Sequence, residues 1–509
     1  MKIQITFLLL AINYSGWAQH TYNIKDYGAI GDGLVTNTVS IQTAIDKAAK
    51  NGGGTVLFPP GKFLTGVIEL KTGVTIHLAE GASLLATAKR IDYGAKDASA
   101  LIVATNQHNI GITGKGTIDG QGNELLKDIY VMLHAGTLAD SEWQTENPWH
   151  QVRPEERNRP KIIEFKNCDG IAIKGIFIKD GLCWVQNYKN CSNLVVDSIH
   201  VESNIFWNND GIDLVDCKNV RVTNSFFNAD DDGICLKSED RNKRCENIYI
   251  ANCRIRSSAS ALKFGTASHG GFKNITVRNI TVFDTYRSAI ALEAVDGGIL
   301  EDVDIRNVTA TNTGNAIFIR LGHRNKDTVI SKVRHVHISN VKAAIPSGKP
   351  DKGYTMEGPL LRYPHNVFPS SVTGLPDNPV EDVVLDSIEI VYEGGASKDS
   401  AFVSADSLHS IPENVAAYPE FSMFGELPAW GLYCRHVNGI SMKNISVKYQ
   451  KEDFRSAVIF DDVSGIRLQK INIISGKSVP VIVFNKSKTV YLRDIRLPVK
   501  DKRAIKTNL

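Results

Sequence analysis

Two acidic motifs lie close together in the middle of the chain. The segment NDGIDL (209–214) is followed by DDGICLK (231–237), and the shared Asp-Gly-Ile-x-Leu pattern places Asp210 and Asp232 at equivalent positions, 22 residues apart. If these segments are strands on successive coils, they lie about 4.8 Å apart and the two carboxylates are close neighbours. Asp231 then points elsewhere, unless a turn reorients it.

Clustered carboxylates suit three kinds of site. Like charges raise one another's pKa, so one carboxyl group stays protonated near neutral pH while another is ionised, as glycoside hydrolysis requires. Acidic clusters also bind Ca²⁺, and aspartate is common in turns. The residues alone leave a catalytic site, a metal site and turn structure open.

The acidic motifs belong to a weak repeat that predicts the fold. Asn or Gly followed by alternating apolar residues recurs, in the early copies at intervals of 23 to 28 residues, and each copy indicates a short strand. Copies begin at Gly170, Asn193, Asn219, Asn247, Asn274, Gly439 and Gly465. Short strands at this period, with little helical pattern between them, predict an all-β parallel β-helix.

Equivalent turns of such a solenoid should stack side chains from coil to coil. Cys168, Cys191, Cys217 and Cys245 each precede a turn residue by two positions, which favours a buried ladder of thiols over disulfides. The turn asparagines tolerate left-handed backbone and should form a similar ladder. The amphipathic segment 38–50 is the one clear helix, and we expect it to cap the first coil.

Long irregular stretches interrupt the repeat at about 122–160, 343–379 and 395–435. Insertions between coils usually gather on one face and build a binding groove. Their large side chains suit stacking on sugar rings, or they simply cover exposed sheet; both interpretations stay open. These residues are Trp143, Trp149, Arg153, Arg157, Tyr354, Arg362, Tyr363, His365, Phe368, Tyr418, Phe421, Phe424 and Trp430.

The N-terminus has the features of a secretory signal. Lys2 precedes an apolar run, and Gly16 and Ala18 have the spacing of a cleavage site, so we expect export and one β-helix domain over 19–509. The chain has 58 Lys and Arg against 55 Asp and Glu, a net charge of +3 that gives no basis for nucleic-acid binding. We expect no membrane insertion, and a monomer.

Together the motifs resemble glycoside hydrolase family 28, the polygalacturonases and their relatives. The resemblance covers most of the chain and includes DYGA (26–29), GDG (31–33), GGGTV (52–56), PPG (59–61), IDGQG (118–122) and RP (159–160). The family's Asn-Thr-Asp motif is similar to NND (208–210) or to its last two residues, with the threonine replaced, and its Asp-Asp motif is similar to Asp231 and Asp232. The resemblance implies a right-handed β-helix and inverting hydrolysis without cofactor or metal. It makes Asp231 the general acid, with Asp210 and Asp232 activating water.

Two of the family's positions differ in this chain. The Gly-His-Gly triplet falls on 257–259, where Ser258 replaces the histidine, and His269 is the candidate to substitute for it in space. The Arg-Ile-Lys motif, which grips a galacturonate carboxylate, falls on 291–293. Glu293 in place of the lysine would repel that carboxylate, which disfavours plain homogalacturonan as substrate.

A row of charged residues offers a replacement sugar site. The repeat predicts that Lys237, Lys263, Glu293 and Arg320 align on successive coils, as a structural charge ladder or as a rebuilt binding site. If the row is a rebuilt binding site, Lys263, Arg287 and Arg320 bind an anionic group of the substrate. The predicted substrate-binding set is Asn209, Lys237, Lys263, His269, Arg287, Glu293 and Arg320.

We therefore predict a secreted inverting hydrolase of pectic or related acidic polysaccharide, with galacturonide or rhamnogalacturonan-type linkages. The insertions narrow the groove, which favours exo action. One alternative is a polysaccharide lyase of the same fold, in which the aspartates hold Ca²⁺ and Lys237 or Lys263 is the base. The other is a non-catalytic carbohydrate-binding β-helix.

Overall fold

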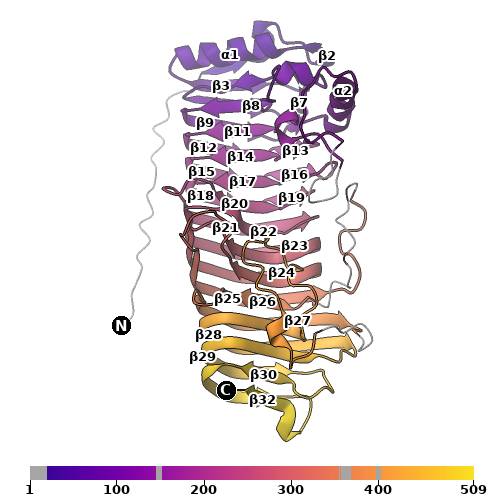
Figure 1. Ribbon diagram of the computed structural model, residues 1–509. Helices are drawn as coiled ribbons and strands as arrows, with labels where there is room; N and C mark the ends of the chain where they lie inside the picture. The colour runs from indigo at the N-terminus through magenta and orange to yellow at the C-terminus, as the bar shows by residue number, and fades with distance from the viewer. Residues whose placement is uncertain are drawn as a thin grey trace, which may run out of the picture.

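The computed structural model describes residues 20–144, 152–354, 356, 361, 368–396 and 403–508. Its strands pair in parallel and stack as rungs, from α1 (Thr38–Lys50) at one end to β32 (Ile505–Asn508) at the other (Figure 1). This confirms the predicted parallel β-helix. Within the described residues, no helix is both long and apolar enough to cross a membrane.

Helix α1 caps the first coil. Its apolar face, with Ile41, Ala44, Ile45 and Ala48 buried, covers the hydrophobic interior that the first rung would otherwise expose. Its bounds are those that the sequence predicted. The coils beneath it contain β1 (Thr21–Asn23), β2 (Asp32–Thr36), β3 (Gly54–Phe58), β4 (Gly61–Thr65), β5 (Ile68–Glu69), β6 (Val74–Leu78), β7 (Ala82–Ala86), β8 (Ile102–Thr105), β9 (His108–Gly114) and β10 (Thr117–Asp119).

The central coils contribute three short strands each. Ile171, Leu194 and Val220 are successive partners in one row, so the predicted repeat sets the register and stacks apolar side chains inward. These strands are β11 (Ile163–Lys166), β12 (Asp169–Lys174), β13 (Phe177–Lys179), β14 (Gln186–Lys189), β15 (Ser192–Asp197), β16 (His200–Ser203), β17 (Ile212–Val215), β18 (Lys218–Thr223), β19 (Phe226–Ala229), β20 (Ile234–Ser238), β21 (Cys245–Ser257) and β22 (Leu262–Ser268).

In the later coils strands run together around the turns, and the same inward row continues to Val490. These strands are β23 (Gly271–Ala294), β24 (Ile299–Leu321), β25 (Lys332–Ile345), β26 (Ser370–Thr373), β27 (Val380–Gly394), β28 (Ala429–Lys451), β29 (Ser456–Ile473), β30 (Ile482–Asn485), β31 (Lys488–Arg496) and β32. Short 3₁₀ turns lie at Ile24–Tyr27, Arg90–Tyr93, Glu156–Asn158, Leu408–Ser410 and Lys502–Ala504.

Both predicted ladders are present. Asn219, Asn247 and Asn274 have φ between 55° and 58°, and the amide of each donates to the asparagine one coil earlier at 3.3, 3.0 and 2.7 Å. The described cysteines are free and buried. The thiol of Cys217 donates to the carbonyl of Tyr188, on the preceding coil, at 3.1 Å. The ladders thus provide hydrogen-bond partners for polar groups at the turns, where the pairing of strands provides none.

The insertions differ from the prediction in two ways. Residues 122–134 are not irregular but form α2 (Gly122–His134), whose buried Leu125, Ile129 and Leu133 recur at helical spacing. Trp430 does not lie in an insertion; it is the second residue of β28 and is 1% exposed in the core, between Tyr392 and Tyr449.

Three of the insertion aromatics cover sheet. Phe368 and Phe421 are buried, with ring centroids 5.3 Å apart, and pack with Tyr286, Ala291 and Phe318 outside the β-helix. Phe424 lies in a second such cluster. Four insertion residues lie outside the described residues, as does the predicted signal: Trp149, Arg362, Tyr363 and His365.

Candidate active site

Asp210 and Asp232 meet on adjacent rungs, as the repeat predicted. Ile212 of β17 pairs with Ile234 of β20, and Gly211 N–H donates to the carbonyl oxygen of Asp232 at 2.9 Å. Both aspartates are 3% exposed, and a carboxylate oxygen of each lies within 4.8 Å of the other. The geometry therefore concentrates negative charge at the start of these two strands.

Two lysines compensate this charge. Lys237 Nζ donates to Asp210 Oδ2 at 2.9 Å and also pairs with the fully buried Asp213. Lys263 Nζ lies 3.3 Å from Asp232 Oδ2. Although burial opposes it, the facing carboxylates hold the pKa of both lysines well above the ordinary value. Both ammonium groups are therefore charged at neutral pH.

Asp231 lies in a different environment. Its side chain is partly exposed, and among the described residues it forms no ion pair. Burial, together with the charges of Asp210 and Asp232, raises the pKa of Asp231 to about 7. Its Oδ1 accepts the N–H of Asp232 at 3.0 Å, which turns the carboxyl group away from the strand direction. The turn thus provides the reorientation that strict alternation forbids.

Asn208 holds Asp231 through an amide whose orientation is fixed. The guanidinium groups of Arg153 and Arg159 both donate to Asn208 Oδ1, from Arg159 at 2.8 Å. The amide nitrogen is therefore left to face Asp231 Oδ2, to which it donates at 3.3 Å. Arg159 is 1% exposed and also donates to the carbonyls of Pro154, Leu182 and Trp207, so the clamp is anchored in backbone.

The position of the missing histidine has a structural occupant. Ser258 donates to Asp230 Oδ1 at 2.5 Å, and Asp230 is 2% exposed, with a pKa that burial raises to about 8. His269 does not substitute for the histidine. It follows β22, and its N–H donates to Ser238, at the opposite end of β20 from Asp232, about 20 Å along the strand.

The register predicted for the row of charged residues is wrong by two positions at Lys263. Lys263 lies opposite Cys235 and Ala291 rather than opposite Lys237 and Glu293. A shift of two keeps a side chain on the same face, so Lys263 still points outward but reaches Asp232 instead of continuing a row. Only the pairing of Glu293 with Arg320 has the expected register.

The last two members of that row are buried. Glu293 is 1% exposed, and burial raises its pKa to about 7 while Lys263 opposes the rise. Arg320 is also 1% exposed and donates to the carbonyls of Gly374, Glu413 and Asn414 at 2.7 to 3.1 Å. Burial lowers its pKa to about 10. The structure directs Arg320 at insertion backbone and does not bring it to the aspartates.

Residues 403–428, here the strap, cross the site from the last insertion. Lys263 Nζ donates to Tyr418 Oη at 2.9 Å, and Arg287 Nε lies 3.6 Å from a carboxylate oxygen of Glu420. The guanidinium of Arg287 also lies 5.9 Å from the centre of the Tyr418 ring. The strap thus covers the side of the carboxylate cluster on which Lys263 and Arg287 lie. It narrows the space that is left for a substrate on that side.

Two further residues border the cluster: Trp184, which the sequence did not single out, and Asn208, the first residue of the NND motif, to which the sequence assigned no role. The Lys237 ammonium lies 4.3 Å from the centre of the Trp184 ring, and Lys161 lies 5.3 Å from it. Trp184 lies two residues before β14, and β14 pairs with β17, the strand that follows Asp210. This position was the only feature of the sequence that pointed to Trp184. Asn209, predicted to bind substrate, is instead fully buried, with its side-chain oxygen bonded to Ser203 at 2.7 Å.

The donor set tests the metal interpretation. Oxygens of Asp210 and Asp232 and the sulfur of Cys235 are close enough together to be ligands of one ion. However, each of the two carboxylates already faces a lysine ammonium, and burial raises the pKa of the Cys235 thiol well above its ordinary value. A neutral thiol between two cations is a poor ligand set for Ca²⁺, which prefers oxygen. The arrangement instead suits acid–base chemistry.

Comparison with known proteins agrees with this chemistry. The model of glycosyl hydrolases family 28 matches residues 52–350. A "Probable polygalacturonase" of Vitis vinifera is 27% identical over 62% of this chain, and an "Exo-poly-alpha-D-galacturonosidase" of Dickeya chrysanthemi is 26% identical over 60%. The matched segments span 60% and 58% of those two relatives, less than two thirds of their lengths.

A solved structure shows that the similarity of fold covers most of the chain. The family 28 exopolygalacturonase of Yersinia enterocolitica superposes on 94% of this chain, and 79% of its own, with a TM-score of 0.60 at 17% identity. The family match includes both acidic motifs and more than half of the sequence. The chain therefore belongs to glycoside hydrolase family 28.

Proposed function

We propose that the protein hydrolyses glycosidic bonds of a uronate-bearing pectic polysaccharide with inversion of configuration. The observation that carries this proposal is the contrast among three neighbouring carboxyl groups. Asp210 and Asp232 each face a lysine, whereas Asp231 has no ion pair among the described residues and a pKa of about 7. One group can hold a proton while its neighbours are ionised, as the reaction requires.

The residues then have distinct roles. Asp231 donates its proton to the leaving glycosidic oxygen as the bond to the anomeric carbon breaks. Asp210 and Asp232 hold a water between them, and the pair accepts its proton as the water oxygen attacks that carbon from the opposite face. Burial and the charge of Asp213 hold the pKa of Asp210 well above its ordinary value, and Lys237 opposes that rise, which favours the ionised form that the base needs. The carboxylates titrate as a group.

The lysines weigh against the lyase alternative. A lyase base must be neutral to take a proton, but Lys237 and Lys263 are each paired with a carboxylate that holds their pKa high. A hydrolase needs the same two lysines charged. The geometry therefore favours hydrolysis over elimination.

The strap supports exo action on an acidic chain. Tyr418 and Glu420 lie against Lys263 and Arg287, so a long polymer has less room beyond that side of the carboxylates. Glu293, which replaces the family's lysine, is buried rather than exposed to sugar, and Lys263 and Arg287 are the cations on the side of the cluster that the strap covers. We further propose that the protein acts after export, for which the signal-like first 18 residues are the support.

Product analysis tests the proposal. Homogalacturonan, both rhamnogalacturonan types and a neutral galactan are incubated with enzyme, and products are resolved by size while NMR follows the first anomer released. We expect saturated short products of inverted configuration from a uronate-bearing polymer only. An unsaturated product absorbing in the ultraviolet, or activity lost with chelator, would contradict it.

The clamp on Asp231 makes a separate prediction. Asn208→Ala removes a hydrogen bond to the carboxylate form, worth about 1.5 kcal/mol for a charged group, so we expect kcat to fall about tenfold. Loss of that bond also raises the pKa of Asp231, so the alkaline limb of the rate profile moves to higher pH. Asn208→Asp, which keeps an acceptor for Arg153 and Arg159, is the control for stability. An unshifted pH profile in Asn208→Ala would show that the clamp is only structural.

A further inference from the structure

Positive charge gathers at the C-terminal end of the solenoid. Residues 476–509 contain nine Lys or Arg and two Asp, a net charge of +7 in a chain whose total is +3, so the rest of the chain is −4. Among these cations, all but Lys506 are exposed. Only four of the nine have an ion-pair partner among the described residues: Lys477, Arg493, Arg503 and Lys506.

The last long strand displays this charge along an open edge. Strand β31 pairs with β29 and with no other described strand, and Tyr491 on it is 52% exposed. Tyr491 lies directly opposite Arg467 of β29, and Arg493 lies opposite Gln469. Arg467 is exposed and has no ion-pair partner among the described residues. The Tyr491 ring therefore stands beside the guanidinium of Arg467, which has no ion pair among the described residues, and next to Arg493, which pairs with Asp494.

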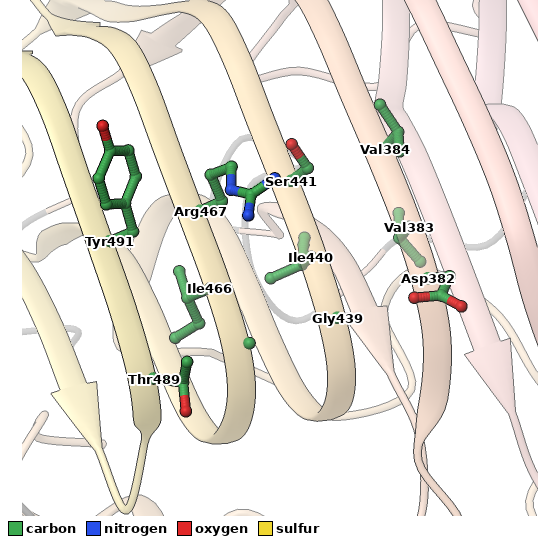
Figure 2. Close-up of a pocket in the computed structure, with 11 residues that line it drawn as sticks. Asp382, Val383, Val384, Gly439, Ile440, Ser441, Ile466, Arg467, Thr489 and Tyr491 are labelled. Atoms are coloured by element: carbon green, nitrogen blue, oxygen red, sulfur yellow. The ribbon is translucent and has the colours of Figure 1, made fainter. Parts of the chain in front are cut away.

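A hollow of about 280 Å³ lies beside these residues. Figure 2 shows Ser441, Arg467 and Tyr491 on successive strands, with Gly439 near the turn of the strand that carries Ser441. Gly465, at the equivalent position of the next coil, also lines the hollow. The equivalent turn positions of earlier coils hold the asparagine ladder, whose side chains fill this space. At Gly439 the carboxylate of Asp382, which also lines the hollow, lies 2.7 Å from where a Cβ would be, whereas no side chain lies within 4 Å of that position at Gly465. The hollow is therefore open to a sugar ring on the side of Gly465, Arg467 and Tyr491.

We propose that this surface binds a uronate-bearing polysaccharide strand away from the catalytic carboxylates. We define the surface as Arg467, Lys488, Tyr491, Arg493 and Arg496 and call it the C-terminal basic face. A tyrosine offers a flat surface to a sugar ring, and a guanidinium forms paired hydrogen bonds with a carboxylate. Arg467 lies six rungs from Asp232 and the other residues of the face lie seven rungs away, about 29 to 34 Å along the solenoid, so the face holds a part of the polymer that is not being cleaved.

Charge decides between this occupant and a second copy of the chain. An open sheet edge can pair with the same edge of another molecule, but two such ends would bring +7 against +7. An acidic polymer gains from the same charge, particularly at low salt. The choice of a uronate polymer rests on the proposed function; binding itself can be measured without catalysis.

Binding is measured in Asp231→Asn protein, which does not consume the polymer, by retardation in native gels that contain polygalacturonate. Arg467→Ser/Arg493→Ser removes two charges from the face. Lys47→Ser/Lys50→Ser is the matched control, since both lysines are exposed on α1 at the opposite end. We expect at least a tenfold rise in Kd for the first pair, about fivefold for Tyr491→Ala, and less than twofold for the control. Neutral galactan should not retard the protein.

Four results would overturn the inference. These are no retardation of the parent protein, equal losses in both double variants, equally tight binding to vesicles containing anionic lipid, and a basic-face variant that keeps its affinity but self-associates. The last would mean that the charge only keeps sheet edges apart. With Asp231 intact, the basic-face variant should cleave short oligosaccharides at the parent rate. If the parent protein, with Asp231 intact, bound polygalacturonate through this face but cleaved none of the polymers, the proposed function would be contradicted and this surface would stand.

Discussion

Replacing Asp231 by asparagine is expected to lower kcat by about 10³-fold, because general acid catalysis contributes about 10² to 10⁴ to a rate and asparagine has no proton to donate. The amide matches the protonated carboxyl group in shape and charge. The fold should therefore survive, with the hydrogen bonds to Asn208 and to the Asp232 N–H rearranged locally. The rate is measured on a pectic oligosaccharide at pH 5 to 9.

The raised pKa of Asp231 also predicts how stability and activity change with pH. A pKa raised to about 7 means that folding becomes less favourable as pH rises from the ordinary carboxyl range towards 7, where Asp231 ionises beside Asp210 and Asp232. The asparagine variant lacks this loss, so it should equal or exceed the parent in stability at pH 8. In the parent enzyme, activity should fall above about pH 7 as the acid loses its proton.

Asp230→Asn is the matched control. Asp230 is the adjacent carboxyl group, but it is bonded to Ser258, and its pKa of about 8 keeps it largely protonated at neutral pH. We expect less than about a threefold change in rate, since it already resembles the amide. An Asp231→Asn enzyme that keeps its rate on natural polymer would remove Asp231 from the mechanism. Selective recovery on an aryl glycoside, whose leaving group needs no proton, would support it.

The repeat made the architecture predictable from the sequence. Alternating apolar residues with Asn or Gly at each turn fix which face points inward, and register then follows because every coil repeats the last. The same logic places Asp210 and Asp232 close together from the sequence alone. It failed at Lys263, where the connection after β20 differs in length from its neighbours and moves the partner by two residues.

The rest of the site comes from contacts distant in sequence. Lys263 and Tyr418 are 155 residues apart, and Arg153 lies 55 residues from Asn208. Neither pair has a periodic signal, because insertions follow no repeat. Helix α2 is different: Leu125, Ile129 and Leu133 recur at helical spacing, so this helix could have been predicted from the sequence. Sequence therefore located the carboxylates, while structure supplied the residues that set their protonation.

Replacing Lys237 by methionine is the second large effect that we expect. The ammonium contacts Asp210 and Asp213, whose side chains are 5% and 0% exposed. Removing one partner of a buried ion pair costs about 3 to 5 kcal/mol, because the remaining charges have neither water nor counter-ion. Methionine keeps the length of the side chain and its packing on Trp184. The loss is measured as the free energy of unfolding in urea.

The pH dependence of that loss has a defined sign. Burial raises the pKa of Asp213 to about 6 and that of Asp210 in the same direction, while Lys237 opposes both shifts. Without the lysine both pKa values rise further. Above about pH 4 the folded variant therefore still holds protons that the unfolded chain has already lost. Its stability should fall progressively as pH increases from 4 to 8. The acid limb of its rate profile should move to higher pH, with kcat at pH 6 lowered about 10²-fold because the base is protonated.

Two further variants separate charge from packing. Lys237→Arg keeps the charge and should recover most of the stability. Lys237→Met/Asp213→Asn removes one of the two stranded carboxylates, so its destabilisation should be smaller than that of Lys237→Met alone, a non-additivity that a double-mutant cycle measures. If Lys237→Met were as stable as the parent at pH 8, the carboxylates would not depend on this ammonium. Asp210 would then need another source for the negative charge that it must hold to activate water.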